Sequence, residues 1–393
     1  MKIALVCPAS LPATQFGGIL FLCVDIARES AKLGHDVTIY TTDLDFANNV
    51  STFNKDLPRL ETHQGFKINR THVWFSFKLF FVNPDMYFQL KKNKPDIIHT
   101  IGIRSFQSFI AALISKKFRI PLVISDQGGL TTHPDLQEGI TRKLAYTLQD
   151  KMVKFVIRQA AKISVANQYE KDIFLEFTDE SKITIVRNGI SLENLYSSSI
   201  NFKEKYSISE RFILFVGRFS LVKGIDILLK SCESISDKLR ESKTRLVIMG
   251  VDFGFEEKMF QMIKELRIED VVMVIRKPPR MDVISAYQAC EFLVLPSRWE
   301  LSPLTPLEGF AFKKAVISTT AHGIPHTLTN GENAILVAPD NHKELAEAIL
   351  KLLDDTKMKN ELGQAGHKLV QEICNSNKMT QNTLEIYKDI LNR

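Results

Sequence analysis

The sequence of 393 residues lacks several features that would assign it to a specialised class of protein. It has no run of about 18 apolar residues, so no helix is expected to cross a membrane. The apolar part of the N-terminal stretch MKIALVCPAS is too short for a signal peptide and predicts a strand. Solenoid-type repeats and low-complexity tracts are also absent. Two globular domains are therefore expected, because a chain of this length seldom folds around one core.

Cysteine is scarce and scattered. The chain contains five cysteines, and no two of them have the C-x-x-C spacing: Cys7, Cys23, Cys232, Cys290 and Cys374. This distribution favours buried, reduced thiols in a cytosolic protein over disulfides or a metal site.

Charge is unevenly distributed along the chain. The net charge is +6; residues 1–190 carry 24 Lys and Arg against 18 Asp and Glu, whereas residues 191–393 carry 27 against 27. A basic first half without an aromatic RNA-binding motif indicates an anionic partner, such as a membrane surface or a phosphorylated acceptor, and not nucleic acid. A solvated surface with a mild lysine excess explains these numbers equally well, so both interpretations stay open.

Short apolar strands alternate with helical patterns along the whole chain. KIALVCP (2–8) predicts a strand, ILFLCVDIARESAKL (19–33) a helix, and HDVTIYT (35–41) a second strand. Such a unit builds a parallel sheet with helices on both faces, so the fold class is α/β and doubly wound. Further strands are expected at 95–101, 121–126, 162–167, 182–188, 245–250, 271–275, 291–297, 315–320 and 334–339.

The chain is expected to divide where this pattern is weakest. Residues 193–209 are polar and loosely patterned, and a second series of strands begins at RFILFVGRF (211–219). We therefore expect two Rossmann-like domains, one over 1–192 and one over 193–375. The last helix, in 376–393, is expected to cross back to the first domain.

The stretch HVWFSFKLFFV (72–82) is unusually rich in aromatic residues. The usual distribution of such residues favours burial in the core. The alternative is an exposed loop that enters the headgroup region of a lipid bilayer.

Two carboxylates frame the stretch ELSPLTPLE (300–308). Glu300 follows the strand at 291–297, on the edge of a doubly wound sheet where ligands bind. Thr305 suits a helix N-cap, so Glu308 is explained by a capping box that needs no ligand. The capping box leaves Glu300 unexplained, and a helix N-terminus is also a site for phosphate.

A basic loop follows the first strand of the second domain. GRFSLVKG (217–224) carries Arg218 and Lys223 between two glycines that let the backbone turn sharply and approach a ligand. A guanidinium and an ammonium beside a helix N-terminus suit a diphosphate. The alternative is that Arg218 and Lys223 are ordinary surface residues that bind no ligand.

Together these stretches resemble a known family. GRFSLVKG, then P-S-x-x-E-x7-E ending at Glu308, then GIPHTLTNGENAILVAP (323–339) resemble the C-terminal half of the family 4 glycosyltransferases. The N-terminal half is similar more loosely, through Gly17-Gly18, LGHDV (33–37), PDIIH (95–99) and NGI (188–190). The resemblance covers nearly the whole chain and implies the GT-B fold, in which two Rossmann-like domains face a cleft.

The resemblance implies that the first domain binds the acceptor and the second binds the nucleotide sugar, with a role for each matching residue of the second domain. Arg218 and Lys223 would hold the donor's diphosphate and stabilise the charge that develops on it. The backbone amides of Leu304 and Thr305 would contact the same phosphates, and Glu308 would accept the ribose hydroxyls. Glu300 would face the sugar and complete the catalytic set with the two cations. The base would lie near Ile275, Arg276 and Lys277.

The first domain would supply the opposite wall. Gly17 and Gly18 would approach the donor, and Asp126 and Gln127 would lie in the cleft. His99 ends a strand and is a further cleft candidate, although a structural role is favoured for a lone histidine. Relatives carry a histidine where this chain has Asp126-Gln127-Gly128-Gly129, and other departures fall at Ser191, Pro303 and His326. These differences fall where the resemblance places contacts to the donor sugar and the acceptor, and none falls on the diphosphate residues.

The resemblance further implies retention of configuration at the anomeric carbon. Because no carboxylate is an obvious nucleophile, front-face attack is favoured, with the departing phosphate deprotonating the acceptor. No metal or other cofactor is expected if the two cations and a helix N-terminus neutralise the diphosphate. Asp43-Leu44-Asp45 has a metal-binding D-x-D form, but its position favours a loop cap.

The sequence therefore predicts a retaining, nucleotide-sugar-dependent glycosyltransferase that acts on a glycan or lipid-linked acceptor in surface polysaccharide synthesis. It is expected in the cytoplasm, peripheral on the inner face of the membrane. The alternatives are an inactive homologue that binds a nucleotide sugar or scaffolds a partner, and an NAD-dependent enzyme. The second is disfavoured because CPASLPATQFGG (7–18) lacks the G-x-G-x-x-G spacing.

Overall fold

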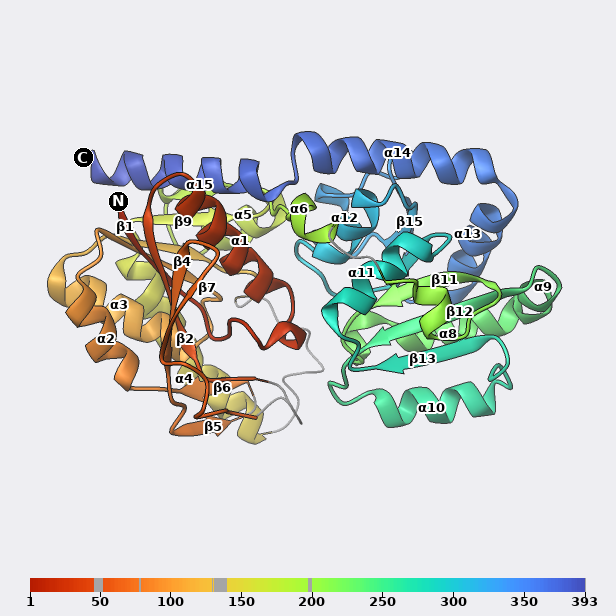
Figure 1. The fold of residues 1–393 in the computed structure, drawn as a ribbon, viewed down its shortest axis with the longest axis horizontal. Helices are drawn as coiled ribbons and strands as arrows, with labels where there is room; N and C mark the ends of the chain where they lie inside the picture. Colours follow the sequence, from red (N-terminus) through yellow and green to blue (C-terminus); the bar gives the residue numbers. More distant parts are fainter. Residues whose placement is uncertain (46–51, 78, 129, 131–139, 197–199, 393) are drawn as a thin grey trace. The chain divides into compact units, whose positions relative to one another are not determined.

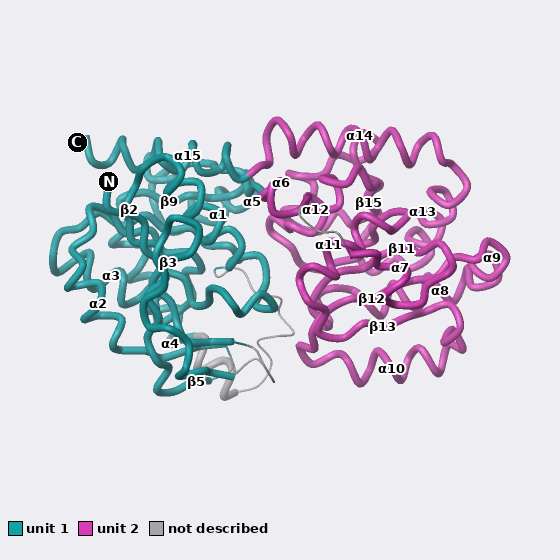
Figure 2. Tube along the Cα trace, in the orientation of Figure 1, with its two compact units in different colours: residues 1–189, 376–393 teal, residues 190–375 magenta. Residues whose placement is uncertain are grey.

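The computed structural model of the chain describes residues 1–45, 52–77, 79–128, 130, 140–196 and 200–392. They form two compact units (Figure 2), one of residues 1–189 with 376–393 and one of residues 190–375. The boundary follows Gly189, slightly before residue 192, where the sequence pattern placed it. The C-terminal segment belongs with the first unit, and its helix lies along the first helix of the chain (Figure 1).

The first unit is built on an eight-stranded sheet with the order β10-β9-β8-β7-β1-β2-β4-β3. All pairs are parallel except β3 with β4. Its strands are β1 Lys2–Val6, β2 Asp36–Thr42, β3 Leu60–His63, β4 Phe66–Thr71, β7 Ile97–Ile101, β8 Leu122–Ser125, β9 Lys162–Val165 and β10 Ile183–Ile185. Its helices are η1 Thr14–Phe16, α1 Gly18–Lys32, α2 Asp85–Asn93, α3 Phe106–Phe118, α4 Ile140–Gln159, α5 Gln168–Leu175, η3 Glu180–Lys182 and α15 Ser376–Leu391.

The second unit is built on a six-stranded parallel sheet with the order β13-β12-β11-β14-β15-β16. Its strands are β11 Arg211–Val216, β12 Thr244–Gly250, β13 Val272–Arg276, β14 Leu293–Leu295, β15 Val316–Thr319 and β16 Ile335–Val337. Its helices are α6 Leu192–Leu195, α7 Phe202–Lys205, η4 Leu221–Lys223, α8 Ile225–Ser234, α9 Ser236–Glu241, α10 Glu256–Glu265, α11 Arg280–Ala289, α12 Leu304–Ala311, η5 Ile324–His326, α13 His342–Asp354 and α14 Thr356–Glu372.

Burial on both faces explains the composition of the central strands. Every residue of β7 is buried, and so are four consecutive residues of β11, Phe212 to Phe215. Parallel strands that helices cover on both faces consist of consecutive apolar residues, and this pattern is why the strands could be predicted from the sequence. In the second unit, separate apolar clusters pack on the two faces of the sheet, one around Ile213 and Phe215 and one around Phe212 and Leu214.

The aromatic stretch 72–82 forms a hairpin, β5 Phe75–Phe77 paired with β6 Phe80–Val82, outside the main sheet. Phe81 is fully buried, but Trp74 is 66% exposed, Phe75 61% and Phe77 48%. The predicted burial of this stretch in the core is therefore wrong for these three side chains. A two-stranded ribbon buries one face at most, and here that face is the one that carries Phe81.

The five cysteines are all buried, and no disulfide forms in the part of the chain that the structure describes. Among the described helices, none is both long enough and apolar enough to cross a bilayer.

Candidate active site

Two loops meet at the carboxyl edge of the second sheet. One runs from β11 through η4 to α8, and the other runs from β14 to α12. They meet because β11 and β14 are neighbours in the sheet, with Leu214 paired to Leu293. The backbone N–H of Arg298 donates to the carbonyl of Val222 at 2.8 Å, which joins the two loops directly.

Two glycines allow this close approach. Gly224 has a φ of +66°, and a Cβ there would lie 2.0 Å from the carbonyl oxygen of Pro296. At Gly323 a Cβ would lie 1.8 Å from the carbonyl oxygen of Leu301, while its N–H donates to the carbonyl of Glu300 at 3.0 Å. Any side chain at either position would push the loop that carries Glu300 out of place.

The three residues expected to form the catalytic set lie together. Lys223 Nζ forms an ion pair with Glu300 Oε1, and their side chains are only 16% and 13% exposed. Ser297 Oγ donates to the same carboxylate oxygen at 3.2 Å. Arg218 is exposed, interacts electrostatically with Glu300, and lies with its guanidinium carbon 4.9 Å from the centre of the Phe253 ring. The site thus combines two cations and a carboxylate on one edge of the sheet.

Arg298 holds this edge together, a role that sequence reasoning missed. Its guanidinium donates to both oxygens of Asp226 at 2.7 and 2.8 Å, to Asp340 at 2.6 Å and to the carbonyl of Leu221 at 2.7 Å. The forked geometry of arginine suits such multiple contacts. Its partners are far away in sequence, so no local pattern could have identified them.

The predicted capping box at Thr305 is wrong. Helix α12 begins at Leu304, its N-cap is Pro303, and no side chain caps it. Pro303 disfavours a helical conformation for the residue before it, so the helix starts directly after it, and Thr305 already lies inside the first turn. The first N–H groups of a helix lack a partner within the helix, so the amides of Leu304 and Thr305 are oriented as an anion site requires.

Glu308 is held by partners other than a cap. Both terminal nitrogens of Arg280 contact the two carboxylate oxygens, one at 3.1 Å, and the hydroxyl of Tyr287 donates to Oε2 at 2.8 Å. Burial, with the nearby Glu308 carboxylate, raises the pKa of the Tyr287 phenol well above its usual value, so the hydroxyl stays a donor. Glu308 is thereby buried and fixed in orientation.

The three base-proximal candidates lie at the end of β13. Ile275 is buried in the core. Arg276 is exposed, donates to Glu256 at 3.3 Å and lies over the ring of Phe260. Lys277 has a φ of 48°, and its N–H donates to the carbonyl of Gly250 at 2.7 Å, which turns the chain away from the sheet.

In the first unit, Gly17 and Gly18 begin α1, after the loop that follows β1. Gly17 has a φ of +110°, and a Cβ there would meet nothing within 4 Å. Backbone conformation, rather than space, is what requires glycine at this position.

His99 is a buried structural residue, so the expectation that it lines a cleft is wrong. It is 1% exposed, with Nδ1 2.6 Å from the hydroxyl of Tyr387 and Nε2 2.8 Å from Ser125 Oγ. Burial lowers the pKa of His99 to about 3, so the ring is neutral. It links β7 and β8 to the C-terminal helix α15.

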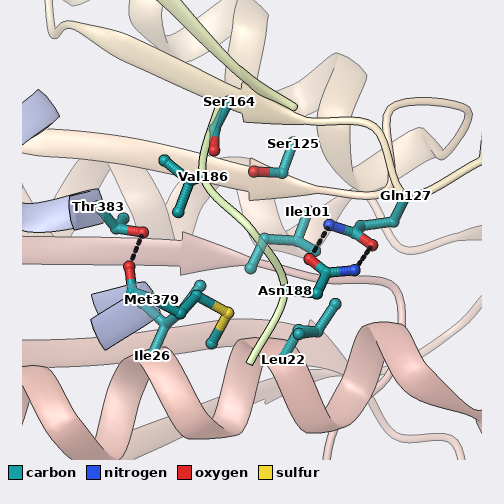
Figure 3. Close-up of a pocket in the computed structure, with 10 residues that line it drawn as sticks. All are labelled: Leu22, Ile26, Ile101, Ser125, Gln127, Ser164, Val186, Asn188, Met379 and Thr383. Carbon is teal, nitrogen blue, oxygen red and sulfur yellow. Dashed lines mark hydrogen bonds between the residues drawn. The ribbon is translucent and has the colours of Figure 1, made fainter. Parts of the chain in front are cut away.

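Asp126 and Gln127 follow β8, and Gln127 lines a small pocket within the first unit (Figure 3). Gln127 and Asn188 exchange two hydrogen bonds of 3.0 Å that close one side of it. None of the ten side chains that line the pocket is charged. Asp126 is buried and accepts from the N–H of Leu130 at 3.0 Å. Near Asp126 lies Glu170, which sequence reasoning missed. Burial raises the pKa of Glu170 to about 8, and the nearby carboxylate of Asp126 adds to this effect.

Asp43, the first residue of the D-x-D sequence, is fully buried. Its carboxylate accepts from the N–H of Val73 at 3.1 Å and lies 2.5 Å from His72 Nδ1. These contacts give Asp43 a structural role at the base of the β5–β6 hairpin. Over the described ranges, no group of three or more His, Cys, Asp and Glu is arranged to hold a metal ion.

Sequence models of two families match the chain. The model described as Glycosyl transferases group 1 matches residues 198–369, and the one described as Glycosyltransferase Family 4 matches residues 16–194. Each match falls almost entirely within one unit. The chain is a family 4 glycosyltransferase.

This glycosyltransferase is similar in sequence to two curated relatives. It is 23% identical to the D-inositol 3-phosphate glycosyltransferase of Corynebacterium glutamicum over 395 residues, 93% of this chain and 91% of that one. It is 26% identical to the capsular polysaccharide biosynthesis glycosyltransferase CapM of Staphylococcus aureus over 254 residues, 62% of this chain and 65% of CapM.

A solved structure of Anabaena HepE in complex with UDP-glucose superposes on the glycosyltransferase with a TM-score of 0.77. The identity is 18%, over 99% of this chain and 100% of HepE. At that identity the likeness shows the shared fold alone. With the two sheets described above it confirms the predicted fold class, GT-B with two Rossmann-like domains.

Proposed function

We propose that this glycosyltransferase transfers a sugar from a nucleotide-sugar donor to a glycan or lipid-linked acceptor, with retention of configuration. The observation that carries the proposal is the site formed by Lys223, Glu300 and Arg218 beside the N-terminus of α12. Two cations and unpartnered helix amides are what a diphosphate leaving group needs. Further support comes from HepE, whose structures contain UDP and UDP-glucose.

In the proposed reaction the bond between the anomeric carbon and the donor's phosphate oxygen breaks, and the nucleoside diphosphate leaves with the electron pair. The acceptor oxygen attacks from the same face, and its proton passes to the departing phosphate. Arg218, Lys223 and the α12 amides stabilise the charge on that phosphate, which is why no divalent metal is required. Glu308, oriented by Arg280 and Tyr287, accepts hydrogen bonds from the ribose.

Surface polysaccharide synthesis is the process we propose for the enzyme, supported by its likeness to CapM. A lipid-linked acceptor would place the reaction at the cytoplasmic face of the membrane. The positive balance of residues 1–190, 24 Lys and Arg against 18 Asp and Glu, supports a peripheral association with anionic lipid there.

Release of the nucleotide from a panel of UDP, GDP, ADP and TDP sugars, with a CMP sugar, whose leaving group has only one phosphate, as the comparison, tests the proposal in the presence of EDTA. Release from one donor is expected, and Lys223→Ala and Glu300→Gln should each lower its rate by about 100-fold or more. Lys230→Ala, which changes an exposed lysine on the neighbouring helix α8, is the matched control and should leave the rate unchanged.

The anomeric configuration of the product, read from its NMR coupling constant, tests retention. An inverted product would exclude the front-face mechanism. Binding of a nucleotide sugar without any release, with and without candidate acceptors, would instead identify a catalytically inactive homologue and overturn the proposal.

A further inference from the structure

The β5–β6 hairpin is attached to the rest of the first unit through its base and through Phe81. At its base, Asp43 accepts from the N–H of Val73 at 3.1 Å, and the N–H of Trp74 donates to the carbonyl of Val82 at 2.9 Å. Phe81 is buried against Phe53, with ring centroids 5.3 Å apart. These contacts anchor the hairpin, and side chains on its other positions are left exposed.

Those outer side chains are large, apolar and close together in the chain. Trp74 is 66% exposed, Phe75 61%, Phe77 48% and Leu79 37%. An exposed cluster of this kind marks an interaction site, since a single exposed apolar residue needs no explanation but a contiguous group does. Tryptophan and phenylalanine are the residues that favour the interface between lipid headgroups and acyl chains.

Helix α3 joins this hairpin to a strongly basic surface. Gln107 donates to the carbonyl of Phe81 at 2.8 Å, and the rings of Phe80 and Phe106 pack edge to face. At its far end α3 carries the exposed Lys116 and Lys117, followed by Arg119.

Helix α4 packs against α3 and extends the basic surface. It exposes Lys151, Lys154 and Arg158. The one acidic residue of α4, Asp150, accepts from Arg104 at 2.7 Å. The exposed charges at the C-terminal end of α3 and on the described part of α4 are thus mainly positive, and their natural complement is an array of phosphates.

We propose that the β5–β6 hairpin inserts its aromatic side chains into the headgroup region of an anionic lipid bilayer, with the lysines of α3 and α4 contacting lipid phosphates. The proposal deepens the proposed function, because it names the surface through which an enzyme with a lipid-linked acceptor would reach the membrane. The mixture of exposed aromatics and basic side chains favours a bilayer, because each part alone would suit a different partner.

Trp74 allows a direct test. The chain has two tryptophans, so Trp299→Phe leaves Trp74 as the single fluorophore. With vesicles of 30% phosphatidylglycerol in phosphatidylcholine at low salt, Trp74 emission should shift to the blue and be quenched by brominated lipid chains. Unchanged emission at saturating vesicle concentration would overturn the proposal.

Variants then separate the two parts of the surface. In a flotation assay, Phe75→Ser/Phe77→Ser should weaken vesicle binding by about 10-fold or more, since two buried aromatic contacts are lost. Lys151→Glu/Lys154→Glu should remove the preference for anionic over neutral vesicles and its salt dependence. Phe177→Ser, which changes an exposed aromatic residue outside the hairpin, is the control and should bind as the wild type does.

Donor turnover distinguishes failure of this inference from failure of the proposed function. The hairpin and lysine variants should release nucleoside diphosphate from a soluble donor at the wild-type rate, because none of these residues belongs to the Lys223–Glu300 site. Normal vesicle binding by the aromatic variant, or a dimer in solution that dissociates when Phe75 and Phe77 are replaced, would overturn the assignment to lipid while leaving the enzymatic proposal intact.

Discussion

Removal of the guanidinium of Arg280 should show how much the ion pair between Arg280 and Glu308 contributes to the stability of the second unit. The Glu308 side chain is only 8% exposed and that of Arg280 is 25% exposed. Arg280→Leu leaves the carboxylate with the hydroxyl of Tyr287 as its remaining side-chain donor among the contacts described above. A buried carboxylate that loses its cation is strongly destabilised, because neither water nor a second charge compensates it.

The size of the effect follows from this burial. Breaking a buried ion pair costs about 3–5 kcal/mol, and the partial exposure of Arg280 places the expected loss near the lower end, about 3 kcal/mol. Tyr287→Phe removes one hydrogen bond to a charged group and should cost about 1.5–3 kcal/mol. Its effect should therefore be no larger than that of Arg280→Leu.

Guanidinium chloride unfolding measures these losses, and a double variant sharpens the test. Arg280→Leu/Glu308→Leu removes both charges, so it should be more stable than Arg280→Leu alone. If Arg280→Leu lowers the free energy of unfolding by less than about 0.5 kcal/mol, a value typical of exposed pairs, the reasoning from burial is refuted.

Binding measurements on Arg280→Leu distinguish an effect on ribose recognition from an effect on phosphate recognition. Because Arg280 orients the proposed ribose acceptor, Arg280→Leu should raise the Kd for UDP. The Kd for inorganic pyrophosphate, which has no ribose, should stay unchanged. Equal weakening of both ligands would show that the variant disturbs the whole site and not Glu308 alone.

Three further predictions concern two buried ionisable side chains and one glycine that has no room for a side chain. Because burial lowers the pKa of His99 to about 3, unfolding takes up a proton below about pH 6.5, and the contribution of His99 to stability should fall by about 2 kcal/mol from pH 7 to pH 5; the difference in stability between the wild type and His99→Gln, measured by urea titration, should change by this amount. The pKa of Glu170 is raised to about 8, so the folded state favours its protonated form, and the contribution of Glu170 to stability should fall by about 3 kcal/mol as the pH rises from 5 to 8. The Glu170→Gln variant should lack this pH-dependent contribution. Gly224→Ala, whose Cβ would lie 2.0 Å from Pro296 O, should lower the melting temperature far more than Gly254→Ala, whose Cβ would meet nothing within 4 Å.

The central part of the candidate site was predictable from local pattern. The apolar run of β11 and the glycines of GRFSLVKG fix a strand, a tight loop and a helix, so the positions of Arg218 and Lys223 follow from sequence order. Their proximity to Glu300 depends on β14 pairing with β11, although two strands intervene in the chain. The family resemblance, and not the periodicity, supplied the expectation that these three residues share one site.

The partners of Glu308 were not predictable in this way. The spacing of Thr305 and Glu308 matches a capping box, but Pro303 starts the helix earlier and moves Glu308 into the second turn. There it reaches Arg280 and Tyr287, which belong to a different helix, α11. The tertiary contact overrides the local motif, because packing of α11 beside α12 carries no signal in the spacing of either.

The ion pair between Lys223 and Glu300 makes donor binding an exchange of anions. Lys223 already has a carboxylate partner, and both side chains are mostly buried, so an arriving diphosphate must compete with Glu300 or share the ammonium with it. Glu300→Gln removes the competing charge but also the group proposed to face the sugar. The variant should therefore bind UDP more tightly than the wild type while turning over its donor more slowly. Weaker UDP binding by Glu300→Gln would mean that Glu300 positions Lys223 for the phosphates instead of competing with them.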